Sequence, residues 1–301
     1  QRRVHGGLNI MGNEKRIKYY TVDAFTDQAF KGNPAAVCLL EDHKSDQWLQ
    51  SVASEFSISI TCFLQRVSGD DHHSSIPRFH LRWFTPVTEV KLCGHATVAA
   101  AHTVFTLLHS DSNVVEFVTL SGLLTVRKIE GEPLEEKGIS IEIDFPAVAT
   151  SEFNSDDFEL LQNGLGRQIS PDVRRTEVLD DIMVELTSLK DVVEVEPVAS
   201  ELLKCSGRGV IVTAKCAPES GFDFCSRFFA PKYGIKEDPV CGTAHCALAT
   251  YWSEKLGKSD MIAYAASRRG GVLVLHLDKE KRRVLMRGKA VTVMEGYIFA
   301  M

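Results

Sequence analysis

The sequence predicts an α+β fold of two similar lobes, each a curled sheet packed around or against one long helix. Three observations support this prediction. Short strand-like runs recur through both halves of the chain, each half has one long Ala-rich helical segment, and each such segment follows a Cys-Gly turn. The turns lie about half the chain apart, which indicates an internal duplication.

The two Cys-Gly turns share their order of residues. In the first, 84–86 (FTP) precedes 93–97 (CGHAT); in the second, 229–231 (FAP) precedes 241–245 (CGTAH). Each runs from an apolar stretch into a segment typical of a helix. A duplicated turn with a reactive side chain in each copy predicts two lobes that face one cleft.

The first half reads mainly as strands. A helix is expected over 45–56, because Trp48, Leu49 and Val52 fall on one side and Ser45 suits its N-cap. A second helix follows the first Cys-Gly turn, over about 96–108. Strands are predicted at 19–25, 35–40, 60–64, 79–84, 114–119, 122–129 and 139–145.

The second half repeats this order, with a helix over about 243–256. Its strands are predicted at 182–187, 192–195, 209–213, 222–229, 261–266, 271–277, 283–287 and 290–294. A last strand from Gly296 to Phe299 is expected to cross back to the first lobe. We expect residues 1–16 to be a disordered tag or upstream segment, 17–146 the N-terminal lobe and 147–301 the C-terminal lobe.

Composition narrows the class of protein. The 301 residues are 44% hydrophobic and 25% charged, with a net charge of −6, so nucleic acid is not an expected partner. No apolar run is long enough to span a membrane. The eight cysteines form no zinc-type CxxC pairs, which favours reduced thiols in a cytoplasmic protein.

The Cys-Gly turns carry the first chemical prediction. A turn that leads into a helix leaves unpaired N–H groups and partial positive charge, which suit a carboxylate or a developing enolate-like anion. Cys93 and Cys241 at such ends are expected to have lowered pKa values and to act as acid or base. The alternative is that both are small buried residues filling tight turns.

Two further side chains lie beside the turns. His95 falls in the first turn of its helix, where it suits an acid or base near neutral pH; a bond to a nearby carbonyl is the alternative. Asp238 precedes the second turn by a few residues, and it either handles a substrate proton or caps the turn.

Other patterns are weaker. The run 70–73 (DDHH) and the pair Cys241 and His245 each lack further metal ligands. The segment 267–271 (SRRGG) places a guanidinium near a carboxylate or forms a basic surface hairpin. No GxGxxG or GxxxxGK[ST] motif is present, so nucleotide binding is unsupported.

Taken together, the motifs resemble the phenazine-biosynthesis PhzF-like family of isomerases. The likeness runs from Tyr19 to Gly296 and is carried by 23–40, 53–64, 82–102, 237–252 and 287–296. It implies a diaminopimelate-epimerase-like fold, in which each lobe is a curled, mostly antiparallel, barrel-like sheet around a central helix. It also implies a homodimer, no cofactor and a small anionic metabolite bound between the lobes.

The resemblance also implies roles for single residues. His95 and Asp238 correspond to residues that assist the proton transfer, and Thr243 to a hydroxyl residue of the second turn. The predicted substrate-binding positions are Asn33, Ile60, Gly94, Ala96, Gly242, Thr243 and Ala244. The family's catalytic glutamate lies in Ser-Glu-Thr, which is Ser59-Ile60-Thr61 here, so Ile60 takes its place. Glu55 is the closest other carboxylate.

The same fold includes two-thiol racemases and epimerases with Cys-Gly in both halves, positions that Cys93 and Cys241 match. Our first hypothesis is therefore an isomerase or epimerase that moves a proton on a small carboxylate-bearing metabolite, using His95 and Asp238 with the two cysteines. Our second is a catalytically silent relative that binds a small acid or a protein partner, which Ile60 favours.

Overall fold

The computed structural model describes residues 15–67, 76–108, 110–129, 139–153, 157–170 and 172–299. The run 70–73 and most of the segment 1–16 lie outside these residues. The first half contains β1 (Arg16–Ala24), β2 (Asn33–Leu40), α1 (Asp46–Phe56), β3 (Ile60–Arg66), β4 (Arg78–Phe84), β5 (Glu89–Val90), α2 (Gly94–His102), a π-helical turn (Thr103–Leu107), β6 (Val114–Thr119), β7 (Gly122–Ile129) and β8 (Ser140–Pro146).

The second half begins with β9 (Thr150–Glu152), which pairs with β10. It continues with α3 (Phe158–Leu165), β10 (Val173–Thr176), β11 (Ile182–Glu185), α4 (Leu189–Val193), α5 (Ala199–Leu202), β12 (Val210–Lys215), β13 (Phe224–Ala230), β14 (Ile235–Asp238), α6 (Gly242–Leu256), β15 (Asp260–Ala265), β16 (Gly271–Asp278), β17 (Arg283–Gly288) and β18 (Ala290–Phe299). Short 3₁₀ turns cover Pro218–Ser220 and Pro231–Tyr233.

Both halves follow one sheet topology. In the first, β2 pairs parallel with β3, β3 antiparallel with β4, β4 parallel with β6, and β6 antiparallel with β7. In the second, β11, β12, β13, β15 and β16 pair in the same sequence of senses. The helix α2 lies in the β4-to-β6 connection and α6 in the equivalent β13-to-β15 connection, so the duplication indicated by the turns is present in the topology.

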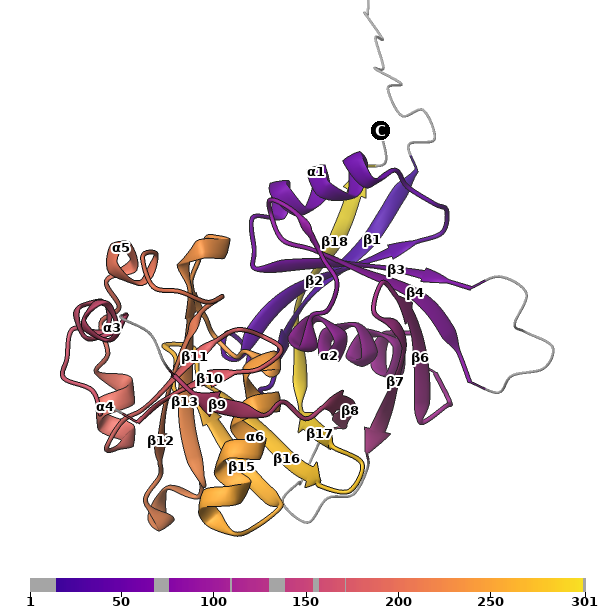
Figure 1. The fold of residues 1–301 in the computed structure, drawn as a ribbon. Helices are drawn as coiled ribbons and strands as arrows, with labels where there is room; N and C mark the ends of the chain where they lie inside the picture. Colours follow the sequence, from indigo (N-terminus) through magenta and orange to yellow (C-terminus); the bar gives the residue numbers. More distant parts are fainter. Residues whose placement is uncertain are drawn as a thin grey trace, which may run out of the picture.

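The two lobes are joined through their sheets and their central helices (Figure 1). Strand β8 pairs with β7 of its own lobe and also with β17 of the second lobe, antiparallel in both cases. The last strand, β18, returns to the first lobe and pairs antiparallel with β1 along its whole length. It includes residues 296–299, which the sequence had suggested as a separate strand.

The core is built around the central helices. Every residue of α2 is buried, which explains why its sequence shows no polar face. One hydrophobic cluster contains residues of α2 and α6 together with the strands that curl around them. A second cluster lies under α3, α4 and α5, and a third lies under α1. The helix α2 is therefore enclosed on all sides, whereas α6 is mostly buried as far as Ser253 and exposes Glu254 and Lys255 in its last turn.

Two sequence predictions about elements were wrong. Residues 192–195 were expected to be a strand, but Val192 and Val193 end the helix α4, which Ser188 caps by accepting a hydrogen bond from the Asp191 amide at 3.2 Å. The helix expected over 96–108 begins at Gly94, and after His102 its hydrogen bonding changes to the wider π type.

The turn before β2 fixes the first residue of that strand, Asn33. Gly32 has a φ of +61°, and a Cβ there would lie 2.2 Å from the Ala24 carbonyl oxygen. Gly221 also has a positive φ, +76°, but a Cβ there would meet nothing within 4 Å. Substitution of Gly221 therefore tests the energetic cost of a positive φ alone, whereas substitution of Gly32 adds the cost of a steric clash.

We expect Gly32→Ala to lower the free energy of unfolding more than Gly221→Ala does. The control variant carries the left-handed penalty of about 1–2 kcal/mol, whereas Gly32→Ala adds an overpacking cost of about 1–3 kcal/mol. Urea unfolding of both variants measures the difference. Equal losses would show that the loop around residue 32 relaxes without cost.

Candidate functional site

The two Cys-Gly turns meet at the contact between the lobes. A Cβ on Gly94 would lie 3.5 Å from the Cα of Gly242, and a Cβ on Gly242 would lie 3.5 Å from the Cα of Gly94. The N-termini of α2 and α6 therefore abut through their first residues. Glycine at both positions permits this approach of the two backbones. Ala96 and Ala244, in the first turns of the two helices, are buried beside it.

The first turn contributes a thiol and an imidazole. Cys93 is the N-cap of α2 in an extended conformation, and its Sγ lies 3.4 Å from Nδ1 of His95. Both residues are buried, with 8% and 4% of their surface exposed. The pair is thus a possible route for a proton at the N-terminus of the helix.

The second turn contributes a thiol, a hydroxyl and a carboxyl. The Sγ of Cys241 lies 3.3 Å from Oγ1 of Thr243, and Thr243 is partly exposed. Asp238 ends β14, and its Oδ1 accepts hydrogen bonds from Asn33 Nδ2 at 2.6 Å and from the Val240 amide at 3.2 Å. Both N–H donors reach Oδ1, and the thiol of Cys241 is a further hydrogen-bond partner of this carboxyl.

Asn33 links the first lobe to the Asp238 carboxyl through a hydrogen bond. Its side chain is fully buried and also donates to the Val240 carbonyl at 3.1 Å. Arg269 holds the turn before it, because its Nε donates to the Gly32 carbonyl at 2.8 Å and its Nη2 pairs with Asp23 at 2.8 Å. Of the two interpretations of 267–271, Arg269 fits a guanidinium near a carboxylate, and that carboxylate belongs to the protein.

The expected lowering of the thiol pKa values is wrong. Burial raises the pKa of Cys93 far above its usual range, and the amides of Ala96 and His95 oppose this only in part. Burial likewise raises the pKa of Cys241, and the negative charge of Asp238 adds to the effect. Both thiols are therefore protonated at neutral pH.

Burial also sets the charge of the other two groups. It raises the pKa of Asp238 to about 6, against which hydrogen bonds from the Val240 amide, Cys241 and Asn33 act. It lowers the pKa of His95 to about 3, so this imidazole is neutral near pH 7. Asp238 is the group of the cluster whose protonation changes close to neutral pH, as a general base requires.

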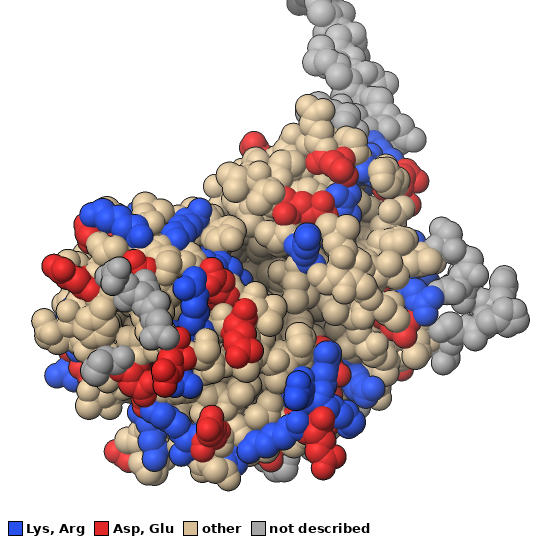
Figure 2. Space-filling model, in the orientation of Figure 1, with Lys and Arg blue, Asp and Glu red and all other residues tan. Residues whose placement is uncertain are grey.

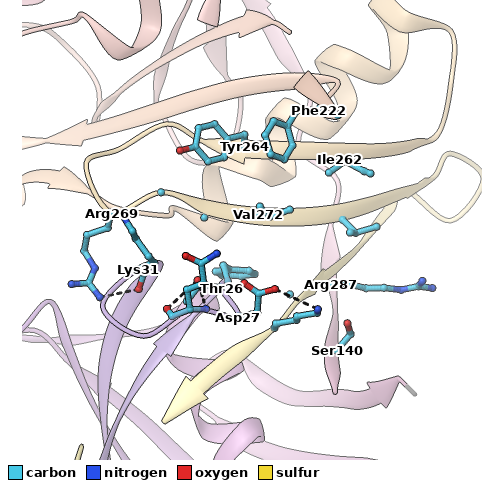
Figure 3. A pocket seen from close by; sticks show the side chains of 18 residues that line it. Thr26, Asp27, Lys31, Ser140, Phe222, Ile262, Tyr264, Arg269, Val272 and Arg287 are labelled. Carbon is cyan, nitrogen blue, oxygen red and sulfur yellow. Dashed lines mark hydrogen bonds and ion pairs between the residues drawn. The ribbon is translucent and has the colours of Figure 1, made fainter. Parts of the chain in front are cut away.

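A separate cavity of about 490 Å³ lies along β15, β16 and β17 (Figure 3). Phe222 and Tyr264 stack on one side of it, with ring centroids 4.9 Å apart. Thr26, Asp27 and Lys31 lie on another side, in the loop before β2. None of the predicted site residues lines this cavity, so the candidate site is defined by the turns. The surface is also hollowed between the two lobes (Figure 2).

The metal alternatives gain no support. Nδ1 of His245 lies 2.7 Å from the carbonyl oxygen of Cys241, so this ring bonds to the backbone of the turn. Among the described residues, no group of three or more His, Cys, Asp or Glu side chains is placed to hold a metal ion. No helix in the described part of the chain is long and apolar enough to cross a membrane.

Comparison with known proteins gives one family. The family model for phenazine biosynthesis-like proteins (PhzC-PhzF) matches residues 22–296. The chain belongs to this family. It is 45% identical to an uncharacterized isomerase of Halalkalibacterium halodurans over 92% of this chain and 96% of that protein.

Solved structures agree with this family and with the predicted fold. A PhzF-family protein of Enterococcus faecalis superposes with a TM-score of 0.82 at 34% identity, covering 95% of this chain and all of the other. A hydroxyproline epimerase of Agrobacterium vitis gives a TM-score of 0.60 at 11% identity, covering 96% and 94% of the two chains. The latter likeness is one of fold, and it confirms the predicted epimerase-like architecture of two lobes.

The position of the glutamate implied by the family is apolar in this PhzF-like chain. Ile60 begins β3, is 5% exposed and packs in the cluster around α2. Beside it, Ser59 Oγ donates to the Pro34 carbonyl at 3.0 Å and lies 3.4 Å from Asn33 Oδ1. Glu55 is exposed on α1, whose buried residues belong to a different cluster, so it does not replace the glutamate.

Sequence reasoning missed two charged residues at the second turn. Arg208 and the buried Asp181 form an ion pair whose guanidinium also reaches Thr243. Neither lies in a motif, and both are distant from Cys241 along the chain. The available signal was an arginine between two glycines, Gly207 and Gly209, but this does not indicate which turn the side chain approaches.

The raised thiol pKa values lead to a measurable reactivity. We expect iodoacetamide to label Cys93 and Cys241 slowly below pH 9, because little thiolate forms there, whereas an ordinary thiol has a pKa of about 8.5. Peptide mass spectrometry after timed labelling gives the rate at each cysteine. The urea-unfolded chain is the control. Fast labelling of both at pH 7 in the folded protein would restore the two-thiol hypothesis.

Proposed function

We propose that the protein is an isomerase that moves a proton on a carbon atom of a small carboxylate-bearing metabolite. Its acids and bases are its own side chains, which lie at the meeting of the two helix ends. The observation that carries this proposal is that the two helix ends abut through Gly94 and Gly242, with the Cys93–His95 pair on one side and the charge of Asp238 acting on Cys93 from the other. Family membership and relatives named as isomerases support it.

The roles follow from the protonation states. Asp238, ionised above about pH 6, takes the proton from carbon and becomes neutral. The helix-end amides stabilise the enolate-like anion that forms. The thiol of Cys93 returns a proton to the carbon skeleton and becomes a thiolate, with neutral His95 at 3.4 Å as its hydrogen-bond partner. Proton exchange with solvent then restores both groups.

Carbon-bound proton exchange in heavy water tests this function. The protein is incubated with a panel of amino and hydroxy acids, and deuterium incorporation is followed by mass spectrometry. We expect incorporation into at least one acid, with a rate that rises as pH passes through about 6 because the base must be ionised. No exchange in any acid that binds would count against the isomerase.

A second function is favoured by Ile60. An isoleucine cannot accept a proton, and its burial leaves no polar group at the position of the family glutamate. A silent relative would bind a small acid at the helix ends without exchange. The variant Ile60→Glu separates the two functions. If the wild type binds an acid without exchanging its carbon-bound proton and Ile60→Glu gains exchange, the missing activity is due to isoleucine at position 60.

A further inference from the structure

Arg208 presents a positive charge at the second Cys-Gly turn. Its Nε and Nη2 donate to the two carboxyl oxygens of Asp181 at 2.8 and 2.6 Å. The Asp181 side chain is 0% exposed, whereas that of Arg208 is 26% exposed. The guanidinium therefore has one edge fixed inside the protein, and part of the side chain faces solvent.

The guanidinium of Arg208 also reaches the first turn of α6. Its Nη2 is 3.4 Å from Oγ1 of Thr243, which itself lies 3.3 Å from the thiol of Cys241. The guanidinium also lies over the ring of Phe228, 5.3 Å from its centroid. Nη1 makes no hydrogen bond to any residue in the described ranges. One edge of the guanidinium is thus fixed by Asp181, while Nη2 reaches a partly exposed hydroxyl and the N–H groups of Nη1 are not used by the described residues.

The positive charge of Arg208 affects the pKa values of two site residues, Cys241 and Asp238. Burial dominates the pKa values of Cys241 and Asp238, and the positive charge of Arg208 opposes it in both. A buried ion pair such as Arg208 with Asp181 rarely stabilises a fold more than apolar residues of similar volume would. Its position beside Thr243 is explained better by recognition of an anion than by stability.

We propose that Arg208 binds the substrate's carboxylate beside Thr243 and that Asp181 is the positioning residue that holds its guanidinium. This inference rests on the proposed function and names the group that selects its substrate class. A planar carboxylate matches two parallel N–H donors, and arginine provides these in a fixed geometry. A neutral amide of the same shape would lack the charge and is expected to bind poorly.

Direct binding tests the proposal without requiring turnover. The probes are L-lactate, L-alanine and L-proline, each compared with its carboxamide. Isothermal titration calorimetry at pH 7 gives the dissociation constant of each probe. We expect the acids to bind the wild type more tightly than the amides do. Arg208→Gln should bind the acids about 10- to 100-fold more weakly and lose this selectivity.

Three further variants make the result specific. Arg208→Lys keeps the charge but not the fork, so it should retain part of the selectivity. Asp181→Asn should reduce selectivity, because the guanidinium loses its anchor, and a purely structural residue would not change an acid-to-amide ratio. Arg82→Gln is the control: Arg82 is 27% exposed, pairs with Glu89 and with Asp46 at 2.7 Å each and lies over Phe84, all in the first lobe.

The outcomes distinguish this proposal from the isomerase itself. Selectivity retained in Arg208→Gln, or no binding of any acid to the wild type, overturns the role of Arg208 even if proton exchange is found. Selectivity lost in Arg208→Gln without exchange in any acid supports the carboxylate site and counts against the isomerase. If Arg208→Gln does not fold, Arg208→Lys and Asp181→Asn decide the question by the same ratio.

Discussion

Asp238→Asn is expected to abolish most of the proton exchange while making the protein more stable at neutral pH. The loss follows from the role of the carboxyl as base: positioned general bases contribute about 10²- to 10⁴-fold to rate, and an amide cannot accept the proton. Asparagine keeps an oxygen for the Asn33 and Val240 donors, which lie at 2.6 and 3.2 Å. The site should therefore keep its shape.

The gain in stability follows from the pKa of Asp238, about 6 in the folded protein against a usual 3.8. Because the folded state holds its proton more tightly, the wild type loses stability as pH rises from about 4 to 6. In the Asp238→Asn variant residue 238 makes no such pH-dependent contribution to stability, because its amide does not titrate. Above pH 6 the variant should be more stable by roughly 1–2 kcal/mol, allowing for the partial exposure of Asp238.

The measurements are exchange rates in heavy water and urea unfolding at pH 4, 5, 6 and 7. Glu237→Gln is the matched control, because this neighbouring carboxylate pairs with Arg227 at 2.6 Å. It should leave exchange unchanged and show no gain above pH 6. If Asp238→Asn exchanged protons at the wild-type rate, Asp238 would not be the base. If its gain in stability did not depend on pH, the gain would not come from a raised pKa of Asp238.

The features that could be predicted from the sequence are those set by residues close together in the chain, such as strand bounds and the two equivalent helices. The strands at 114–119 and 122–129 have the bounds that were expected, because alternating residues and a turn delimit them. The duplicated turns indicated two equivalent helices, and the sheet topology shows the same repeat. These features depend on neighbours in the chain, which the sequence contains directly.

What could not be predicted depends on distant neighbours. The pKa values of Cys93 and Cys241 are raised because both turns are enclosed by the facing lobe, and only helix-end chemistry was visible in the sequence. Arg208 and Asp181 reach Thr243 through folding alone. The carboxyl of Asp238 likewise depends on Asn33, more than two hundred residues earlier in the chain.

The contact between the helix ends gives the second large effect. A Cβ at Gly94 would lie 3.5 Å from Gly242 Cα and 3.6 Å from the Phe145 ring, which are ordinary contacts. Gly94→Ala should therefore cost little. Gly94→Val adds two methyl groups where the first carbon already touches both neighbours, so we expect a loss of about 1–3 kcal/mol in the free energy of unfolding.

The larger consequence of Gly94→Val is for the site. The valine must push the N-termini of α2 and α6 apart, which moves the Cys93–His95 pair away from Asp238. Because misplacement of reacting groups by about 1 Å can cost on the order of 100-fold in rate, exchange should fall by that order while the protein stays folded. Circular dichroism and exchange rates on the same samples measure both effects.

The pseudo-symmetry of the lobes supplies the control. Gly242→Val should behave like Gly94→Val, because a Cβ at Gly242 would contact Gly94 Cα at 3.5 Å and Met286 Sδ at 3.5 Å. Both valine variants should lose exchange, and both alanine variants should keep it. If only one valine variant lost activity, the two turns would not form one shared site, and the chemistry would belong to a single lobe. We expect both valine variants to lose exchange because the N-termini of α2 and α6 position each other by direct contact.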